Sequence, residues 1–177
     1  MTTAIAKRQS AVRTALIDAA LVGAACLIPT ISHLTALPLY RLNPMALVLV
    51  GGMVAVRDRR NALLLAVLLP TVSMLAVGMP SPAKALCMAA ELLTVASLAT
   101  LAERAWGRQS AALPSALARF GAAAAMMTGA LMGGKAVYYG LKALLLPSAA
   151  LVGTPVLTQA AAVAAAAVLY ALFRTKK

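Results

Sequence analysis

The segment MMTGALMGGKAVYYG, residues 126–140, places one charged residue, Lys135, in a run that is otherwise apolar, small or aromatic. Inside the hydrocarbon core of a membrane such a charge costs about 3 kcal/mol to more than about 10 kcal/mol, depending on how far the side chain can reach toward water. Chains therefore seldom carry one without a use. The role of Lys135 depends on whether the surrounding chain spans a membrane.

The composition of the whole chain is that of an integral membrane protein. Of its 177 residues, 63% are hydrophobic and 11% are charged, whereas about 25% of the residues of soluble domains are charged. A spanning helix needs about 20 residues, so about six spans with short connections use nearly the whole length. We therefore expect one all-α domain, a polytopic membrane protein with six transmembrane helices.

The apolar runs predict spans at approximately residues 14–31, 44–56, 62–77, 83–102, 116–141 and 156–173. The second span, 44–56, covers only about 20 Å at about 1.5 Å per residue, which is less than the hydrocarbon core of about 30 Å. The preceding loop, 32–44, contains two prolines and is expected to dip into the membrane or lie over a cavity. The longest polar connection is expected at 103–115. Five or seven spans remain open, because periodicity can merge or divide the fifth.

The basic residues indicate the topology. The net charge is +12, and most of the positive charges lie at every second boundary between apolar runs, as cytoplasmic connections require. Both termini are therefore expected in the cytoplasm. Nucleic-acid binding is not expected, because the chain lacks the basic and aromatic surface of such modules. The residues at these boundaries are Lys7, Arg8, Arg13, Arg57, Arg59, Arg60, Arg104, Arg108, Arg119, Arg174, Lys176 and Lys177.

Asp18 interrupts the first apolar run. Basic residues before that run resemble the start of a signal peptide, but Asp18 and the later spans favour an uncleaved first helix. Asp18 is expected to pair with Arg13 or another arginine near the membrane surface, or to face a partner. The neighbouring small residues permit close approach of another helix, within the bundle or from another protein. These residues are Ala19, Ala20, Gly23 and Ala24.

Glu91 and Lys135 are expected at the same depth in the membrane. Glu91 lies about eight residues from the outer start of the fourth span, and Lys135 about seven from the outer end of the fifth, so both are about 10–12 Å deep. Opposite charges in a low dielectric each lower the cost of burying the other. Two interpretations remain open: a structural ion pair that fixes two helices, or charged groups that face a cavity open to the outside.

Further polar groups are expected near this pair. Tyr138 and Tyr139 follow Lys135 by about one turn, Gln159 lies at a similar depth in the sixth span, and the outer loop contributes Tyr40 and Asn43. Tyrosine rings can stack on a ring of a ligand. The glycines of the fifth span, Gly129, Gly133 and Gly134, are expected either to permit close helix packing or to make space for a ligand.

Signatures of catalysis are missing from the sequence. It contains no HExxH, GxSxG or GxxxxGK[ST] motif and no paired aspartates that could hold catalytic magnesium. We therefore expect neither an enzyme nor a complete nucleotide-driven pump. No metal or other cofactor is expected either, since His33 is the single histidine.

Three features resemble the substrate-binding S-component of energy-coupling factor (ECF) vitamin transporters. They are the small-residue pairs Ala19/Gly23 and Ala20/Ala24 of the first span, the loop SHLTALPLYRLNPM before a short second span, and the segment LLPTVSMLAVGMPSPAKALCMAAELL at residues 68–93. The similarity covers roughly residues 18–102. The last two spans lack a motif that would identify a substrate.

The resemblance implies a six-helix subunit of the bacterial cytoplasmic (inner) membrane that captures a small micronutrient from outside. It implies a ligand site at Tyr40, Asn43, Glu91, Lys135, Tyr139 and Gln159, with Tyr138 beside it. It also implies that the small residues of the first span, Ala20 and Ala24 above all, contact a transmembrane T-component, while two ATPase subunits supply energy. The competing hypothesis is a structural or assembly membrane protein without a ligand, in which Glu91 and Lys135 only hold the bundle together.

Overall fold

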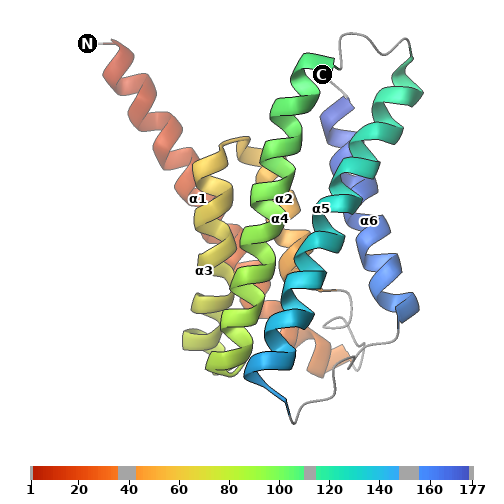
Figure 1. The fold of residues 1–177 in the computed structure, drawn as a ribbon. Coiled ribbons are helices and arrows are strands. Elements are labelled where there is room, and N and C mark those ends of the chain that lie inside the picture. Colours follow the sequence, from red (N-terminus) through yellow and green to blue (C-terminus); the bar gives the residue numbers. More distant parts are fainter. Residues whose placement is uncertain (1, 36–42, 110–114, 148–155, 176–177) are drawn as a thin grey trace.

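In the computed structural model the described residues form six α-helices (Figure 1). The structure describes residues 2–35, 43–109, 115–147 and 156–175, and all regular secondary structure within these ranges is helical. This confirms the all-α fold class. The helices are α1 (Thr2–Thr35), α2 (Pro44–Val56), α3 (Arg59–Val77), α4 (Pro82–Gln109), α5 (Ala116–Leu145) and α6 (Val156–Thr175).

The outer surface of the bundle is apolar on every long helix. Within the described ranges, five helices, α1 and α3 to α6, are long and apolar enough to cross a membrane, and α2 is a shorter apolar helix. Soluble proteins seldom expose large contiguous apolar patches. The chain therefore has the features of a multi-pass membrane protein. Outward-facing leucines that are between 60% and 85% exposed occur on each of the five, at Leu16, Leu64, Leu75, Leu86, Leu117, Leu144 and Leu157.

The shortest helix, α2, lies at the centre of the bundle. It contacts α1, α3, α4 and α6, and its Leu49 and Val50 are completely buried. Pro44 suits the start of the helix, because the first backbone N–H groups of a helix have no partner within it. The buried residues of α2 are Met45, Ala46, Leu49, Val50, Gly52 and Met53, whereas Ala55 near its end is exposed.

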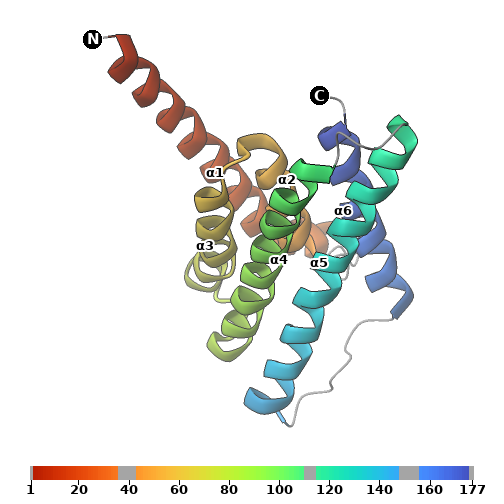
Figure 2. The same cartoon turned by 45° about the horizontal axis from the view of Figure 1, so that its top comes forward.

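Successive helices alternate in direction, so the turns gather at two ends of the bundle (Figure 1). The start of α1, the α2–α3 turn, the end of α4, the start of α5 and the end of α6 lie at one end. We call it the basic end, because it carries Arg57, Arg59, Arg104, Arg119 and Arg174. The α3–α4 turn, the end of α5 and the start of α6 lie at the opposite end. The first half of α1 projects away from the other helices (Figures 1 and 2).

Local sequence signals set the helix ends at these turns. The carboxylate of Asp58 accepts a hydrogen bond from the backbone N–H of Arg60 at 3.0 Å, and the hydroxyl of Ser115 accepts one from that of Ala118 at 3.1 Å. Both satisfy an N–H group that the first turn of a helix leaves unpaired. Gly78 ends α3 in the left-handed conformation, with φ 72, which glycine adopts without strain.

Several helices are longer than the apolar runs that predicted them. Residues 32–35 continue α1, residues 103–109 continue α4, and α5 reaches Leu145. The first part of the connection expected at 103–115 is therefore helical, as far as Gln109. Glu, Arg, Ala and Gln, which occupy much of 103–109, are strong helix formers, so the helix continues beyond its apolar part. Hydropathy limits the part of a helix that can face lipid, but it does not mark where backbone hydrogen bonding stops.

Candidate functional site

A buried carboxylate lies between the start of α2 and helices α4 and α5. Glu91 of α4 is 3% exposed. Its Oε1 lies 2.8 Å from Nζ of Lys135 on α5 and accepts a hydrogen bond from Nδ2 of Asn43 at 2.9 Å. A buried charge is tolerated when it is paired and hydrogen-bonded. The structure thus brings Glu91 and Lys135 together and adds Asn43 as a third member.

Two glycines of α5 permit this arrangement. A Cβ atom at Gly134 would lie 2.9 Å from the carbonyl oxygen of Glu91 and 2.5 Å from Cγ2 of Val95. A Cβ at Gly133 would lie 2.6 Å from Cδ1 of Leu98. Both glycines therefore serve close packing of α5 on α4, which brings the next residue, Lys135, to Glu91. A Cβ at Gly129 would meet nothing within 4 Å.

Asn43 reaches Glu91 from the residue before α2. Its backbone is left-handed, with φ 49 and ψ 62, a conformation that asparagine adopts more readily than most residues. The carbonyl oxygen of Asn43 begins α2 by accepting hydrogen bonds from the N–H groups of Ala46 and Leu47 at 3.0 Å and 3.3 Å. Its side chain makes no capping bond and is directed to the carboxylate instead.

Tyrosines extend the polar group from α5 to α6. Nζ of Lys135 lies 5.3 Å from the ring centroid of Tyr138, and the rings of Tyr138 and Tyr139 meet edge to face with centroids 5.4 Å apart. The hydroxyl of Tyr139 donates a hydrogen bond to Oε1 of Gln159 at 2.6 Å. These contacts form a continuous set that connects the residue before α2 with α4, α5 and α6. We call this set the polar network: Asn43, Glu91, Lys135, Tyr138, Tyr139 and Gln159.

All but one of the residues predicted to bind a ligand belong to the polar network. The exception, Tyr40, lies outside the described residues. The prediction rested on depth in the membrane and on residue type, and the structure adds that these side chains touch one another. Glu91 and Lys135 were expected at one level because the rise of an α-helix per residue is constant, and their side chains do meet.

The polar network presents a cation that is more accessible than its counterion. The side chain of Lys135 is 18% exposed and that of Glu91 is 4% exposed. An ammonium group has three N–H donors, and the contact with Glu91 uses one. A carboxylate or phosphate can accept from the remaining donors while Glu91 keeps the ammonium in position. The rings of Tyr138 and Tyr139 offer apolar faces to a flat ligand.

The small residues of α1 face outward. Ala19, Ala20, Gly23 and Ala24 are all exposed, and a Cβ at Gly23 would meet nothing within 4 Å. This surface was expected to pack either within the bundle or against another protein. The described part of the chain does not pack against it.

Asp18, next to this surface, turns inward. Its Oδ1 accepts a hydrogen bond from Nδ2 of Asn61 on α3 at 2.9 Å. Among the described residues its partner is therefore an amide and not the expected Arg13. Asn61 is 7% exposed, so this bond satisfies a polar group that would otherwise be buried without a partner.

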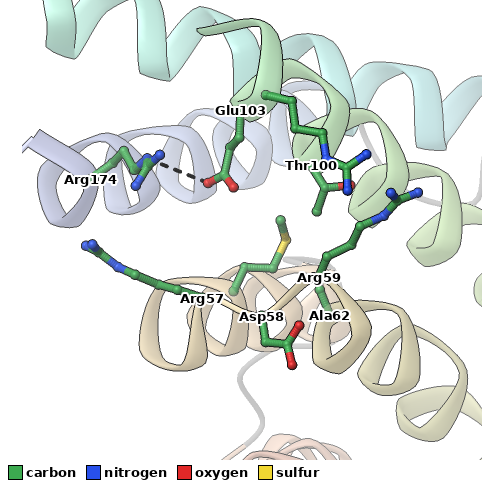
Figure 3. Close-up of a pocket in the computed structure, with 9 residues that line it drawn as sticks. Arg57, Asp58, Arg59, Ala62, Thr100, Glu103 and Arg174 are labelled. Atoms are coloured by element: carbon green, nitrogen blue, oxygen red, sulfur yellow. Dashed lines mark ion pairs between the residues drawn. The ribbon is translucent and has the colours of Figure 1, made fainter. Parts of the chain in front are cut away.

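A second polar cluster, at the basic end, was not predicted. Glu103 of α4 accepts a hydrogen bond from the hydroxyl of Tyr170 and lies 3.6 Å from Nε of Arg174. The guanidinium of Arg57 donates a hydrogen bond to the carbonyl oxygen of Phe173 at 3.2 Å. These contacts connect the ends of α2 and α4 to α6 around a cavity of about 240 Å³ (Figure 3).

The lining of this cavity mixes charges of both signs. Asp58 and Glu103 partly balance the arginines, which are Arg57, Arg59, Arg104 and Arg174. The charge pattern assigned these arginines to topology alone, so their contacts were missed. A usable signal was present: one acid near the end of the fourth apolar run, and one arginine at the end of a sixth run that returns to the same side.

Comparisons of the chain with protein-family models, curated proteins and solved structures found no match.

Proposed function

We propose that this chain is a substrate-capture membrane subunit, similar to the S-component of ECF-type vitamin importers. It crosses the inner membrane of a bacterium six times, with both termini in the cytoplasm. It binds a small water-soluble vitamin or related micronutrient in a cavity that faces outward. Its role is binding without catalysis.

The observation that supports this proposal is the extent of the polar network. An ion pair that only joins two helices needs groups on α4 and α5. Here the contacts continue to Asn43 before α2 and, through Tyr138 and Tyr139, to Gln159 on α6. Desolvating that many polar side chains is costly, which favours a binding role for them. Lys135 receives an anionic group of the ligand, and the tyrosines contact a ring.

The outward face of α1 is assigned to a partner protein because its small residues are exposed. Ala20 and Ala24, with Ala19 and Gly23, are exposed, and small residues permit a partner helix to approach closely in a membrane. The partner is the T-component, which joins the chain to two ATPase subunits.

One observation favours the competing function, a structural or assembly protein without a ligand. Oε1 of Glu91 already has two partners, Lys135 and Asn43, so the buried charge is compensated without a ligand.

Thermal unfolding of the detergent-purified chain with a panel of water-soluble vitamins distinguishes the two functions. A ligand at 100 times its dissociation constant stabilises the folded state by about 2.7 kcal/mol. A capture subunit shows such a shift with one compound or a small group, and it co-purifies with a T-component and ATPases. The absence of a shift with every compound would favour the structural role.

Variants then test the site. Lys135→Ala and Tyr139→Phe are expected to reduce the ligand-dependent shift, each compared with its own unliganded state so that a loss of intrinsic stability does not interfere. Lys84→Ala is the matched control for charge, because Lys84 is exposed on the first turn of α4. If Lys135→Ala and Glu91→Gln both reach the membrane and keep full ligand uptake, the assignment of the site is wrong.

A further inference from the structure

A larger hollow, of about 770 Å³, lies at the basic end between α1, α2 and α6. Its floor is α2, which contacts both neighbouring helices, while α1 diverges from the bundle toward its start (Figures 1 and 2). A Cβ at Gly51, on this floor, would meet nothing within 4 Å. The hollow therefore reaches the backbone of α2.

The lining of this hollow is amphipathic. Its charged members are Arg13 and Arg57, which lie toward the basic end, since Arg13 precedes the apolar Ile17 by one turn of α1 and Arg57 follows the last residue of α2. The hydrogen bond to the carbonyl oxygen of Phe173 holds the Arg57 guanidinium between α2 and α6. Much of the remaining lining is apolar, including Ile17, Val54, Leu169 and Phe173.

No acid is among the described residues that line the hollow. Asp18, close to it in α1, is hydrogen-bonded to Asn61 of α3, and Asp58, next to Arg57, caps the start of α3. The smaller cavity at the same end differs, because Asp58 and Glu103 help to line it. Among the described residues, the lining of the larger hollow therefore supplies no acid to Arg13, while Arg57 also lines the smaller cavity with its two acids.

We propose that this hollow binds an anionic phospholipid, with its phosphate between Arg13 and Arg57 and an acyl chain along Ile17, Val54 and Phe173. Guanidinium groups bind phosphate with paired, charge-assisted hydrogen bonds. Free phosphate would leave the apolar lining uncovered, and a zwitterionic lipid would carry its own cation into a basic site. A lipid with a net negative headgroup satisfies both parts of the lining. This site is separate from the polar network and does not depend on the proposed function.

The test uses the purified chain in a mild detergent, with thermal unfolding and native mass spectrometry as readouts. The probes are dioleoylphosphatidylglycerol, dioleoylphosphatidylcholine and, as headgroup without chains, sn-glycerol 1-phosphate. We expect the phosphatidylglycerol to raise the unfolding temperature more than the phosphatidylcholine at equal mole fraction and to stay bound in the mass spectrometer. We expect glycerol phosphate to have no effect.

Charge variants locate the binding. Each arginine removed near an anionic lipid is expected to weaken binding about fivefold, so Arg13→Gln with Arg57→Gln abolishes the preference for phosphatidylglycerol, while Arg13→Lys with Arg57→Lys keeps most of it. Arg119→Gln removes the same charge from the exposed start of α5, at the basic end but outside the hollow, and is expected to keep the preference.

A volume variant gives a second route if the charge variants fold poorly. Gly51→Leu places a branched side chain on the floor of the hollow without changing any charge and is expected to reduce lipid binding. Gly121→Leu is its control, since a Cβ at Gly121 also meets nothing within 4 Å, on α5. Equal protection by both phospholipids, or protection by glycerol phosphate, would overturn the proposal. An unchanged lipid preference in Gly51→Leu would also overturn the proposal. A protein partner would then be the remaining occupant of the hollow.

Discussion

At the scale of single residues, one carboxylate oxygen of Glu91 contacts two donor groups. Nζ of Lys135 and Nδ2 of Asn43 both contact Oε1, at 2.8 Å and 2.9 Å. In a low dielectric each group depends on the others, because removing one partner of a buried ion pair leaves a charge without compensation. The loss should also be unequal for the two charges, since the side chain of Lys135 is 18% exposed and that of Glu91 is 4% exposed.

Lys135→Met is expected to destabilise the chain by about 3 kcal/mol, because it leaves the less exposed charge unpaired. Glu91→Gln is expected to cost less, about 1–2 kcal/mol, because the amide oxygen still accepts from Asn43 and the more exposed ammonium can reach water. The double variant should recover part of the loss, with a coupling energy of about 1–3 kcal/mol. Unfolding in a detergent titration measures all three values. Strictly additive losses would mean that the two charges do not interact.

At the scale of helices, the site depends on the distance between α4 and α5. Contact at Gly133 and Gly134 brings the two helices together along the turn that carries Lys135. In membranes such close approach allows dispersion contacts between backbones, in the absence of a hydrophobic force between helices. The ion pair is therefore a consequence of helix packing as well as of charge.

Gly134→Ala is expected to destabilise the chain by about 1–3 kcal/mol and to weaken ligand binding together with the ion pair. Its added Cβ would lie 2.9 Å from a backbone oxygen of α4, which cannot move aside as a flexible side chain can. Gly129→Ala is the matched control, because its Cβ meets nothing within 4 Å. It should stabilise the helix by about 1 kcal/mol through helix propensity. Equal effects of the two substitutions on thermal unfolding would contradict this account of the α4–α5 contact.

The helices and part of the site could be predicted from sequence because both follow regular geometry. Apolar runs locate helices, and a constant rise per residue places Glu91 and Lys135 at one depth. The bond from Asn43 to Glu91 could not be predicted, because it depends on a left-handed residue at the start of α2. The bonds from Asn61 to Asp18 and from Tyr170 to Glu103 depend on how helices rotate about their axes. Charge counts and weak periodicity in an alanine-rich chain do not determine that rotation.

At the scale of the whole molecule, the number of membrane crossings depends on whether α2 spans the membrane. The helix has 13 residues, fewer than the about 20 that usually span a membrane. It nevertheless runs antiparallel to both α1 and α3 (Figure 1). If α2 counts as a crossing, the chain crosses six times and both termini lie on one side. Five crossings would place the termini on opposite sides, and would require α1 to run opposite to its direction in Figure 1.

Cysteine labelling tests the number of crossings, because it shows on which side of the membrane a residue lies. In a background with Cys26→Ala and Cys87→Ala, we expect Arg13→Cys, before the apolar part of α1, and Arg119→Cys, at the start of α5, to react with a membrane-impermeant maleimide only after cells are opened. Lys84→Cys should react in intact cells, because Lys84 is exposed on the first turn of α4 at the opposite end, and the arginine-rich side of a bundle is the cytoplasmic one. Labelling of Arg13→Cys in intact cells, with Arg119→Cys protected, would show that α2 does not cross. Such a result would also contradict the fold, in which the start of α1 and the start of α5 lie at the same end of the bundle (Figure 1).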